Sequence, residues 1–241
     1  MAVRKNKGKT GIIRLLEFVL RLSFQFVLGV SILIITTIVL FRYFDPPTWS
    51  WKIQREFSSS ATYPEIARHQ WVSLDRIAPS VQLAVVAAED QRFPTHFGID
   101  PEAIIDALEE ADRGNRLRGA STLTQQTAKN LFLWSNRDLA RKVLEMGIAL
   151  LLELFWDKQR ILEVYLNIVE FGPGVFGVGA ASKYWFQAPA GQLSKRQAAR
   201  LAAVLPNPWR YRAHPPSPYV VERSRWIEQQ MEQLGYAWLH Q

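Results

Sequence analysis

The sequence predicts a mainly α-helical domain with one N-terminal transmembrane helix. Two patterns indicate this fold class: twenty consecutive uncharged residues near the N-terminus, and a series of helix-length segments that begin at capping residues or proline. Sustained period-2 alternation, the pattern of strands, is scarce. With 241 residues, 48% apolar and 21% charged, the chain has room for one domain and an accessory segment. Cysteine is absent, which excludes disulfides, a thiol nucleophile and Cys-ligated zinc.

The positive charge of the chain is concentrated at its N-terminus. A net charge of +7 and a pI of about 9.8 would suggest binding to nucleic acid or to an anionic membrane. Residues 1–44, however, contain seven basic residues and one acidic residue, so that the rest of the chain carries only +1. We therefore expect no nucleic-acid partner. The sequence also has no G-x-x-x-x-G-K-[ST] loop for a nucleoside triphosphate.

Residues 22–41 are predicted to form the transmembrane helix. At about 1.5 Å per residue, such a helix spans the hydrocarbon layer of a bilayer. The alternative is a cleaved signal peptide, whose apolar region runs to about 15 residues and ends at a small-residue site. This run is longer and ends in LFRYFDPP, which favours a retained anchor. The basic residues in 1–21 predict that the N-terminus is cytoplasmic and the remainder external.

The external part is predicted to be a linker over residues 42–78 and a domain over residues 79–241. Asp45-Pro46-Pro47 ends the membrane helix, and residues 48–78 read as irregular and aromatic. Proline in the first turn predicts a helix over 79–88, and Asp100 caps a helix over 101–112 that Gly114 follows. The next segments predicted to be helical cover 121–133, 139–155 and 158–168, the last of them capped by Asp157.

The C-terminal third contains two more predicted helices. A glycine-rich stretch over 171–179 precedes them. Ser194 and Gln197 form the pattern of a capping box for a helix that ends before Pro206. Ser217-Pro218 starts the last helix, and Gly235 ends it.

Glu89 and Asp90 are the first candidates for chemistry, because they follow a very apolar helix. Burial would raise the pKa of such a carboxyl and make it a better base near neutral pH. The alternative is a solvated helix end, which fits poorly because negative charge is unfavourable at the C-terminus of a helix. His96, taken alone, is more typical of a packed or hydrogen-bonded loop residue.

Two further clusters suggest a polar, anionic ligand. Hydroxyl and amide side chains between 121 and 127 could bind a polyhydroxylated or amide-bearing ligand, or could simply form a solvated first turn. Four cations, Lys129, Arg137, Arg141 and Lys142, surround Glu145 in sequence. A structural ion pair is the simpler interpretation of Arg141 and Glu145. So many cations nevertheless suit an anionic leaving group such as a diphosphate.

Together these segments resemble the peptidoglycan glycosyltransferases, glycosyltransferase family 51, whose five motifs occur here in order. The first is matched by Glu89, Asp90, Phe93, His96 and Gly98, and the second by Gly119, Ser121, Thr122, Thr124, Gln125 and Gln126. Arg141, Lys142 and Glu145 match the third. The fourth is matched by Lys158, Ile161, Leu162, Glu163, Tyr165, Leu166 and Asn167, and the fifth by Arg200, Val204 and Leu205. The segment 158–167 also reads as largely scaffold.

The resemblance implies a lysozyme-like fold and an enzyme that polymerises lipid II into β-1,4-linked glycan strands. It implies inversion at the donor anomeric carbon and release of undecaprenyl diphosphate. By position, Glu89 is expected to be the general base on the acceptor 4-hydroxyl and Glu145 the second carboxylate near the diphosphate. Lys129 and Arg137 are expected to hold the diphosphate, with Arg141 and Lys142 in the same region. The resemblance also allows a divalent cation, Mg²⁺ or Mn²⁺, near the diphosphate.

The expected location is the bacterial cytoplasmic (inner) membrane, with a single pass and an external catalytic domain. Expected partners are lipid II, the growing glycan strand, membrane lipid, and other cell-wall synthesis or division proteins. Residues 131–134 are expected to be either an apolar lip that dips into lipid or ordinary core. No S-x-x-K motif occurs, so we expect a monofunctional enzyme without transpeptidase activity. The rival interpretations are a glycan-cleaving hydrolase or lytic enzyme, and a non-catalytic anchored scaffold.

Overall fold

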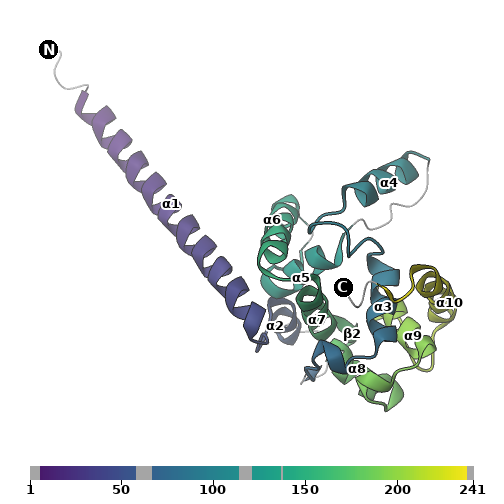
Figure 1. Cartoon of the computed structure of the whole chain (residues 1–241). Helices are drawn as coiled ribbons and strands as arrows, with labels where there is room; N and C mark the ends of the chain where they lie inside the picture. The colour runs from purple at the N-terminus through teal and green to yellow at the C-terminus, as the bar shows by residue number, and fades with distance from the viewer. Residues whose placement is uncertain (1–5, 58–66, 114–120, 137, 238–241) are drawn as a thin grey trace. The chain divides into compact units, whose positions relative to one another are not determined.

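A computed structural model describes residues 6–57, 67–113, 121–136 and 138–237 (Figure 1). The chain divides into two compact units after Phe44. The first consists of one long helix, α1 (Asn6–Tyr43). Its segment Arg14–Tyr43 is long and apolar enough to cross a membrane, and it contains the predicted span 22–41. Large apolar side chains are exposed along it, as lipid-facing residues would be, so α1 is a candidate membrane anchor.

The second unit, Asp45–Gln241, is mainly helical, which confirms the predicted fold class. Its helices are α2 (Ser50–Glu56), α3 (Pro79–Glu89), α4 (Pro101–Asp112), α5 (Leu123–Phe132), α6 (Leu139–Phe155), α7 (Lys158–Ile168), α8 (Gly177–Phe186), α9 (Lys195–Val204) and α10 (Pro218–Leu234). Two short 3₁₀ turns lie at Leu74–Arg76 and Ala190–Gln192. A small sheet has the order β1-β3-β2, built from β1 (Arg68–His69), β2 (Glu170–Gly172) and β3 (Val175–Phe176). β1 runs parallel to β3, and β2 runs antiparallel to it.

The caps expected from the sequence set the observed helix starts. The side chain of Asp100 accepts a hydrogen bond from the Ala103 amide at 2.9 Å, and that of Asp157 accepts one from the Arg160 amide at 2.7 Å. Ser194 and Gln197 form the expected capping box of α9. The helix predicted over 121–133 runs over Leu123–Phe132, because Thr122 forms a second capping box with Gln125.

One stretch of the predicted secondary structure was wrong, and another had been given no assignment. Residues 48–78 were expected to be irregular, but they contain α2, β1 and a 3₁₀ turn, and Trp49 within them is only 2% exposed. The glycine-rich stretch 171–179 holds most of β2, β3 and the start of α8. A Cβ added at Gly179 would lie 2.4 Å from the carbonyl oxygen of Gln70, so this glycine lets α8 pack closely on the segment that sequence analysis treated as linker.

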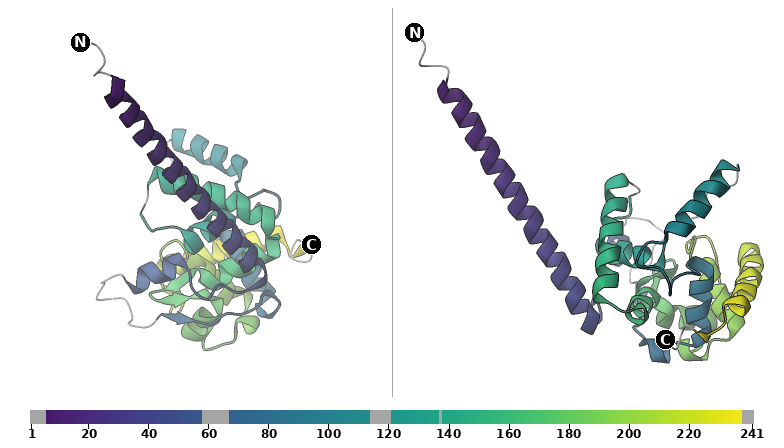
Figure 2. Two further views of the ribbon diagram at one scale, coloured as in Figure 1. Left: turned by 90° about the vertical axis from the view of Figure 1, so that its left-hand side faces the viewer. Right: turned by 45° about the horizontal axis from the view of Figure 1, so that its top comes forward.

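The buried helices α3 and α7 position the candidate site. Residues 81–87 of α3 are all buried, and α3 packs against α9 and α10, while α5 packs against α6 and α7 (Figures 1 and 2). Ile161, Leu162 and Tyr165 of α7 are buried almost completely. This packing fixes the C-terminal end of α3 beside the first half of α5. The carboxylate that ends α3 therefore lies next to the polar cluster that begins α5.

Candidate active site

Glu89 is the last residue of α3 and is held by α5 and α7. Gln126 donates a hydrogen bond from its Nε2 to Oε2 of Glu89 at 2.9 Å, and the Tyr165 hydroxyl donates to Oε1 of Gln126 at 3.0 Å. Burial raises the pKa of Glu89, and the Gln126 hydrogen bond and the nearby Arg223 and Lys129 only partly offset that effect. Glu89 is thus a half-buried, partly desolvated carboxylate with a higher affinity for protons than an ordinary glutamate.

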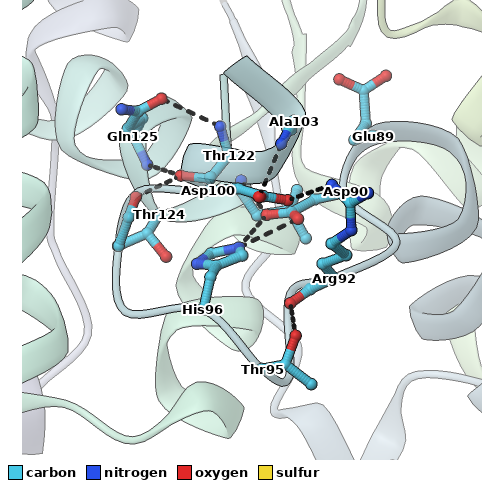
Figure 3. A network of polar contacts seen from close by, with 12 residues as sticks. Glu89, Asp90, Arg92, Thr95, His96, Asp100, Ala103, Thr122, Thr124 and Gln125 are labelled. Carbon is cyan, nitrogen blue, oxygen red and sulfur yellow. Dashed lines mark hydrogen bonds and ion pairs between the residues drawn. The ribbon is translucent and has the colours of Figure 1, made fainter. Parts of the chain in front are cut away.

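A cleft of about 660 Å³ opens beside Glu89, between α3, α4, α5 and α10. Ser121, Thr122, Gln126, Arg223 and Trp226 are among the residues that line it. Figure 3 shows the Glu89 carboxylate pointing away from the hydrogen-bond network around Asp90. Helix α4, which lines one side of the cleft, extends away from the rest of this unit (Figure 2). Glu89 is thus placed to meet a ligand that enters the cleft.

Asp90 is adjacent to Glu89, but its side chain makes structural contacts instead of lining up with the Glu89 carboxylate. It is buried, accepts a hydrogen bond from the Leu123 amide at 2.8 Å, and lies 2.9 Å from Nε2 of His96 (Figure 3). The Thr122 hydroxyl donates to the carbonyl oxygen of Gly98 at 2.6 Å. Asp90, His96 and Gly98 therefore tie the loop after α3 to the start of α5 and support the site from behind.

A second buried network surrounds Glu153, which the sequence analysis missed. Its Oε1 accepts hydrogen bonds from the Thr124 hydroxyl at 2.6 Å and from Nζ of Lys158 at 2.7 Å. Lys158 also donates to the carbonyl oxygen of His96 at 2.6 Å, and its ammonium lies over the ring of the buried Phe93 at 4.6 Å. A lone carboxylate within the apolar run LLLELF was a signal that a buried partner exists.

Some hydroxyl and amide side chains at the start of α5 are buried in the scaffold, and others line the cleft. Thr124 and Gln125 are 0% and 2% exposed, and both are occupied by internal hydrogen bonds. Ser121 and Gln126 line the cleft instead. Arg223 of α10 is another residue that the sequence analysis missed: its Nη2 donates to the Ala88 carbonyl at 3.1 Å, beside Glu89. No local pattern links α10 to α3, so no sequence signal could have found it.

Glu145 on α6 lies in the predicted cluster of cations. It is 2% exposed, Arg141 donates from Nη1 to its Oε2, and Lys142 donates from Nζ to its Oε1 at 2.6 Å. Nζ of Lys142 also lies 2.9 Å from the hydroxyl oxygen of Ser121, a residue of the cleft. Two cations on one buried carboxylate exceed the simple ion pair that was the alternative, and they leave Lys142 at the edge of the cleft.

Lys129 is a third cation of this region, and it lies on α5. It lies one turn after Gln126 on α5, and its positive charge is stabilised by both Glu145 and Glu89. Burial lowers its pKa nonetheless, as do the neighbouring Arg141 and Lys142. Its side chain forms no hydrogen bond or ion pair with any residue that the structure describes, and its ammonium lies 5.2 Å from the centre of the Trp51 ring.

The remaining predicted residues lie elsewhere. Arg137 and Gly119 fall outside the described residues. Glu163 pairs with Arg160 at 3.2 Å, and the buried Asn167 exchanges two hydrogen bonds of 2.8 Å with the backbone of Val72. Arg200 is not among the residues that line the cleft. Glu163 and Asn167 of α7 therefore belong to the scaffold around the site.

The side chains around Glu145 fit a divalent metal ion poorly. Both of its carboxylate oxygens accept hydrogen bonds from cations. Across the described parts of the chain, no group of three or more histidine, aspartate or glutamate side chains is arranged to hold a metal. The lysine and arginine side chains are therefore the groups that would face an anion here.

A desolvated carboxylate beside a separate cationic cluster is the arrangement expected of an enzyme that transfers a sugar from a phosphate-linked donor. The chain belongs to the transglycosylase family: residues 57–232 match it. The enzyme class expected from the sequence, a glycosyltransferase, is thereby confirmed, and the mainly helical unit fits a lysozyme-like fold.

Similar proteins carry a more specific name. A "Biosynthetic peptidoglycan transglycosylase" of Shewanella oneidensis is 56% identical over 211 residues, which cover 88% of this chain and 90% of the relative. Proteins of the same name from Aeromonas hydrophila and Vibrio parahaemolyticus are 55% and 52% identical. These alignments cover 83% and 86% of this chain, and 85% and 93% of the respective relatives.

Proposed function

We propose that this peptidoglycan transglycosylase polymerises lipid II into β-1,4-linked glycan strands and releases undecaprenyl diphosphate. The observation that carries the proposal is the two-part site: Glu89 as a desolvated carboxylate, and Lys129, Arg141 and Lys142 gathered about Glu145. The two parts belong to one site, because Nζ of Lys142 lies 2.9 Å from the hydroxyl oxygen of Ser121, which lines the cleft together with Glu89. Polymerisation of lipid II by the purified protein, with Glu89→Gln as the inactive comparison, tests the proposal.

The chemistry requires a base and a place for negative charge. Glu89 accepts the proton of the acceptor 4-hydroxyl as that oxygen forms a bond to the donor anomeric carbon. The bond between this carbon and the phosphate oxygen breaks, and its electron pair leaves with the diphosphate. A single displacement of this kind inverts the anomeric carbon. Diphosphate is a good leaving group, so positive charge near it can replace the general acid that cleavage of a sugar–sugar bond needs.

Two residues orient the reacting groups without reacting themselves. Gln126, fixed by the Tyr165 hydroxyl, directs the Glu89 carboxylate. Glu145 holds Arg141 and Lys142 in place by accepting from both. Since both Glu145 oxygens are occupied in this way, we assign Glu145 the role of positioning the cations that face the diphosphate, and Glu89 alone the role of base.

A membrane-bound substrate calls for a lipid-facing surface, which we place on α6. Of the two alternatives for residues 131–134, a lip or ordinary core, the core alternative holds for Leu131 and Leu133, which are 5% and 4% exposed. Exposed apolar side chains lie along one face of α6 instead, at Leu139, Val143, Leu150 and Leu154. We propose that this face contacts the outer leaflet of the inner membrane, and that α1 is retained with its N-terminus in the cytoplasm.

Charges on the α6 face should weaken use of membrane-embedded substrate. For a Val143→Asp, Leu154→Asp double variant, we expect turnover of lipid II in vesicles to fall at least about tenfold, because each buried carboxylate costs several kcal/mol in an apolar layer. Turnover of detergent-dispersed lipid II and the unfolding temperature should change little, since both positions are 61–65% exposed. An equal loss in vesicles and in detergent would contradict the lipid contact.

The pH profile should follow the raised pKa of Glu89. A base must be ionised, so kcat/KM falls as pH drops through that pKa, and this acid limb should lie above the pH typical of an unperturbed glutamate. Gln126→Leu removes a hydrogen bond that lowers the pKa of Glu89, so the acid limb should move further toward neutral pH. The comparison is a pH series of kcat/KM for both proteins; a limb that stays in place would show that Glu89 is not the titrating base.

A further inference from the structure

The short helix α2 is docked on the C-terminal end of α5. The Ser50 hydroxyl and the Gln54 amide donate to the carbonyl oxygen of Leu133 at 2.8 and 2.9 Å. The Ser135 amide donates to Oε1 of Gln54 at 2.8 Å. Since the match to the family begins at residue 57, α2 lies outside the segment that defines the family. It is nevertheless bonded to the helix that carries Gln126 and Lys129.

Trp51 of α2 lies against Lys129. The Lys129 ammonium lies 5.2 Å from the centre of the Trp51 ring, within the range of a cation–π contact. The ring also lies 5.1 Å from the guanidinium carbon of Arg55, whose Nε is 3.2 Å from Oε2 of the buried Glu170. Arg55 is therefore fixed, and the Trp51 ring lies near both this fixed cation and Lys129.

The cation–π contact is the one contact described for the Lys129 ammonium, whereas the neighbouring cations are bound to a carboxylate. Arg141 and Lys142 are bound directly to Glu145, whereas Lys129 has no hydrogen bond or ion pair to any residue within the described parts of the chain. A lysine side chain with four rotatable bonds loses much conformational freedom when it is held in one position. An aromatic face attracts the charged ammonium without occupying its hydrogen-bond donors, which stay available to a phosphate oxygen.

We propose that Trp51 is a positioning residue for Lys129: its ring holds the Lys129 ammonium one turn of α5 beyond Gln126, the residue bonded to Glu89, where it can meet the departing diphosphate. The proposal rests on the proposed function, because it assigns the diphosphate of lipid II to Lys129. It makes α2, which sequence analysis treated as linker, a part of the active site.

The test is a double-mutant cycle on lipid II affinity in full-length protein. All variants carry Glu89→Gln so that substrate is bound without turnover, and the dissociation constant of lipid II is measured in detergent. Trp51→Leu should weaken binding about tenfold, and Trp51→Phe, which keeps an aromatic face, about twofold. In a Lys129→Gln background, Trp51→Leu should add no further loss, because the group through which it acts is gone.

A matched control lies one residue away on the same helix. The Lys52 ammonium is 5.5 Å from the Trp49 ring, so Lys52→Gln removes another cation–π contact of α2 without touching Lys129, and it should leave lipid II affinity within about twofold. The unfolding temperature of each variant separates loss of fold from loss of positioning. An undiminished effect of Trp51→Leu in the Lys129→Gln background, or equal losses for Trp51→Leu and Trp51→Phe, would overturn the role of Trp51. Failure of the parent Glu89→Gln protein to bind lipid II would instead refute the proposed function.

Discussion

The Glu89→Gln enzyme should lose lipid II polymerisation by about 10²–10⁴-fold while keeping its fold, since removal of a general base costs this much. The new amide has nearly the shape of the carboxylate and can still accept from Nε2 of Gln126, so the geometry of the cleft is retained. Because the folded-state pKa of Glu89 is raised, its ionisation takes stability away as pH rises through its pKa. The variant should therefore unfold at the same or a higher temperature at neutral pH.

Glu109→Gln is the matched control for this prediction. Glu109 lines the same cleft from α4, but it is exposed and pairs with Arg113 at 3.1 Å. Its replacement should leave kcat/KM within about threefold, because an exposed pair contributes less than about 1 kcal/mol. Initial rates of glycan formation from lipid II, together with thermal unfolding of both variants, provide the measurement. Near-normal turnover of Glu89→Gln would remove Glu89 from the role of base.

The Glu145→Gln enzyme should lose both activity and stability, in contrast to Glu89→Gln. It leaves Arg141 and Lys142 without their negative partner in a place where the carboxylate is 2% exposed. Breaking a buried ion pair from one side costs about 3–5 kcal/mol, so the free energy of unfolding should fall by an amount of this order. With its cations released from their positions, the site should lose at least about 10²-fold in kcat/KM.

Glu163→Gln provides the comparison for Glu145→Gln. Glu163 also belongs to a motif and also pairs with a cation on its own helix, Arg160 at 3.2 Å, but it lies in the scaffold. We expect its replacement to leave kcat/KM within a few-fold. Urea unfolding and kinetics of both variants are compared side by side. A stable, fully active Glu145→Gln protein would contradict the role assigned to Glu145.

The sequence predicted the features that depend on local chemistry. Asp100, Asp157 and Ser194 mark helix starts because a short polar side chain satisfies free amide groups within its own turn. The carboxylate at the end of an apolar helix was expected to be partly desolvated, and the half-buried Glu89 with its raised pKa agrees, since the buried residues just before it exclude water on one side. The position of Lys129 one turn from Gln126 follows from helix geometry alone.

The features that were missed depend on contacts between distant segments. Glu153 meets Thr124 and Lys158 only after three helices have packed together. Glu89 and Asp90 are adjacent carboxylates that the sequence alone does not distinguish. Only the fold directs Glu89 toward the cleft and Asp90 toward the backbone amide of Leu123 in α5. The region before residue 79 looked irregular because its elements are too short to show a period, and their burial comes from the domain they pack on.

The sequence also could not show which apolar side chains of this region are exposed. Residues 131–134 and the outer positions of α6 are similarly apolar, and the sequence does not say which of them faces inward. Packing buries Leu131 and Leu133 and leaves Val143 and Leu154 at the surface. Apolar composition thus left lip and core open for residues 131–134, and the fold decides which apolar residues stay exposed.

Incubation of the full-length protein with lipid II, in parallel with preformed glycan strands, tests the central claim most directly. The two-part site predicts that lipid II is consumed, that glycan chains grow and undecaprenyl diphosphate is released, and that preformed strands keep their length. Shortening of the preformed strands while lipid II stays intact would contradict it, because the cationic cluster at Glu145 would then have no diphosphate to receive.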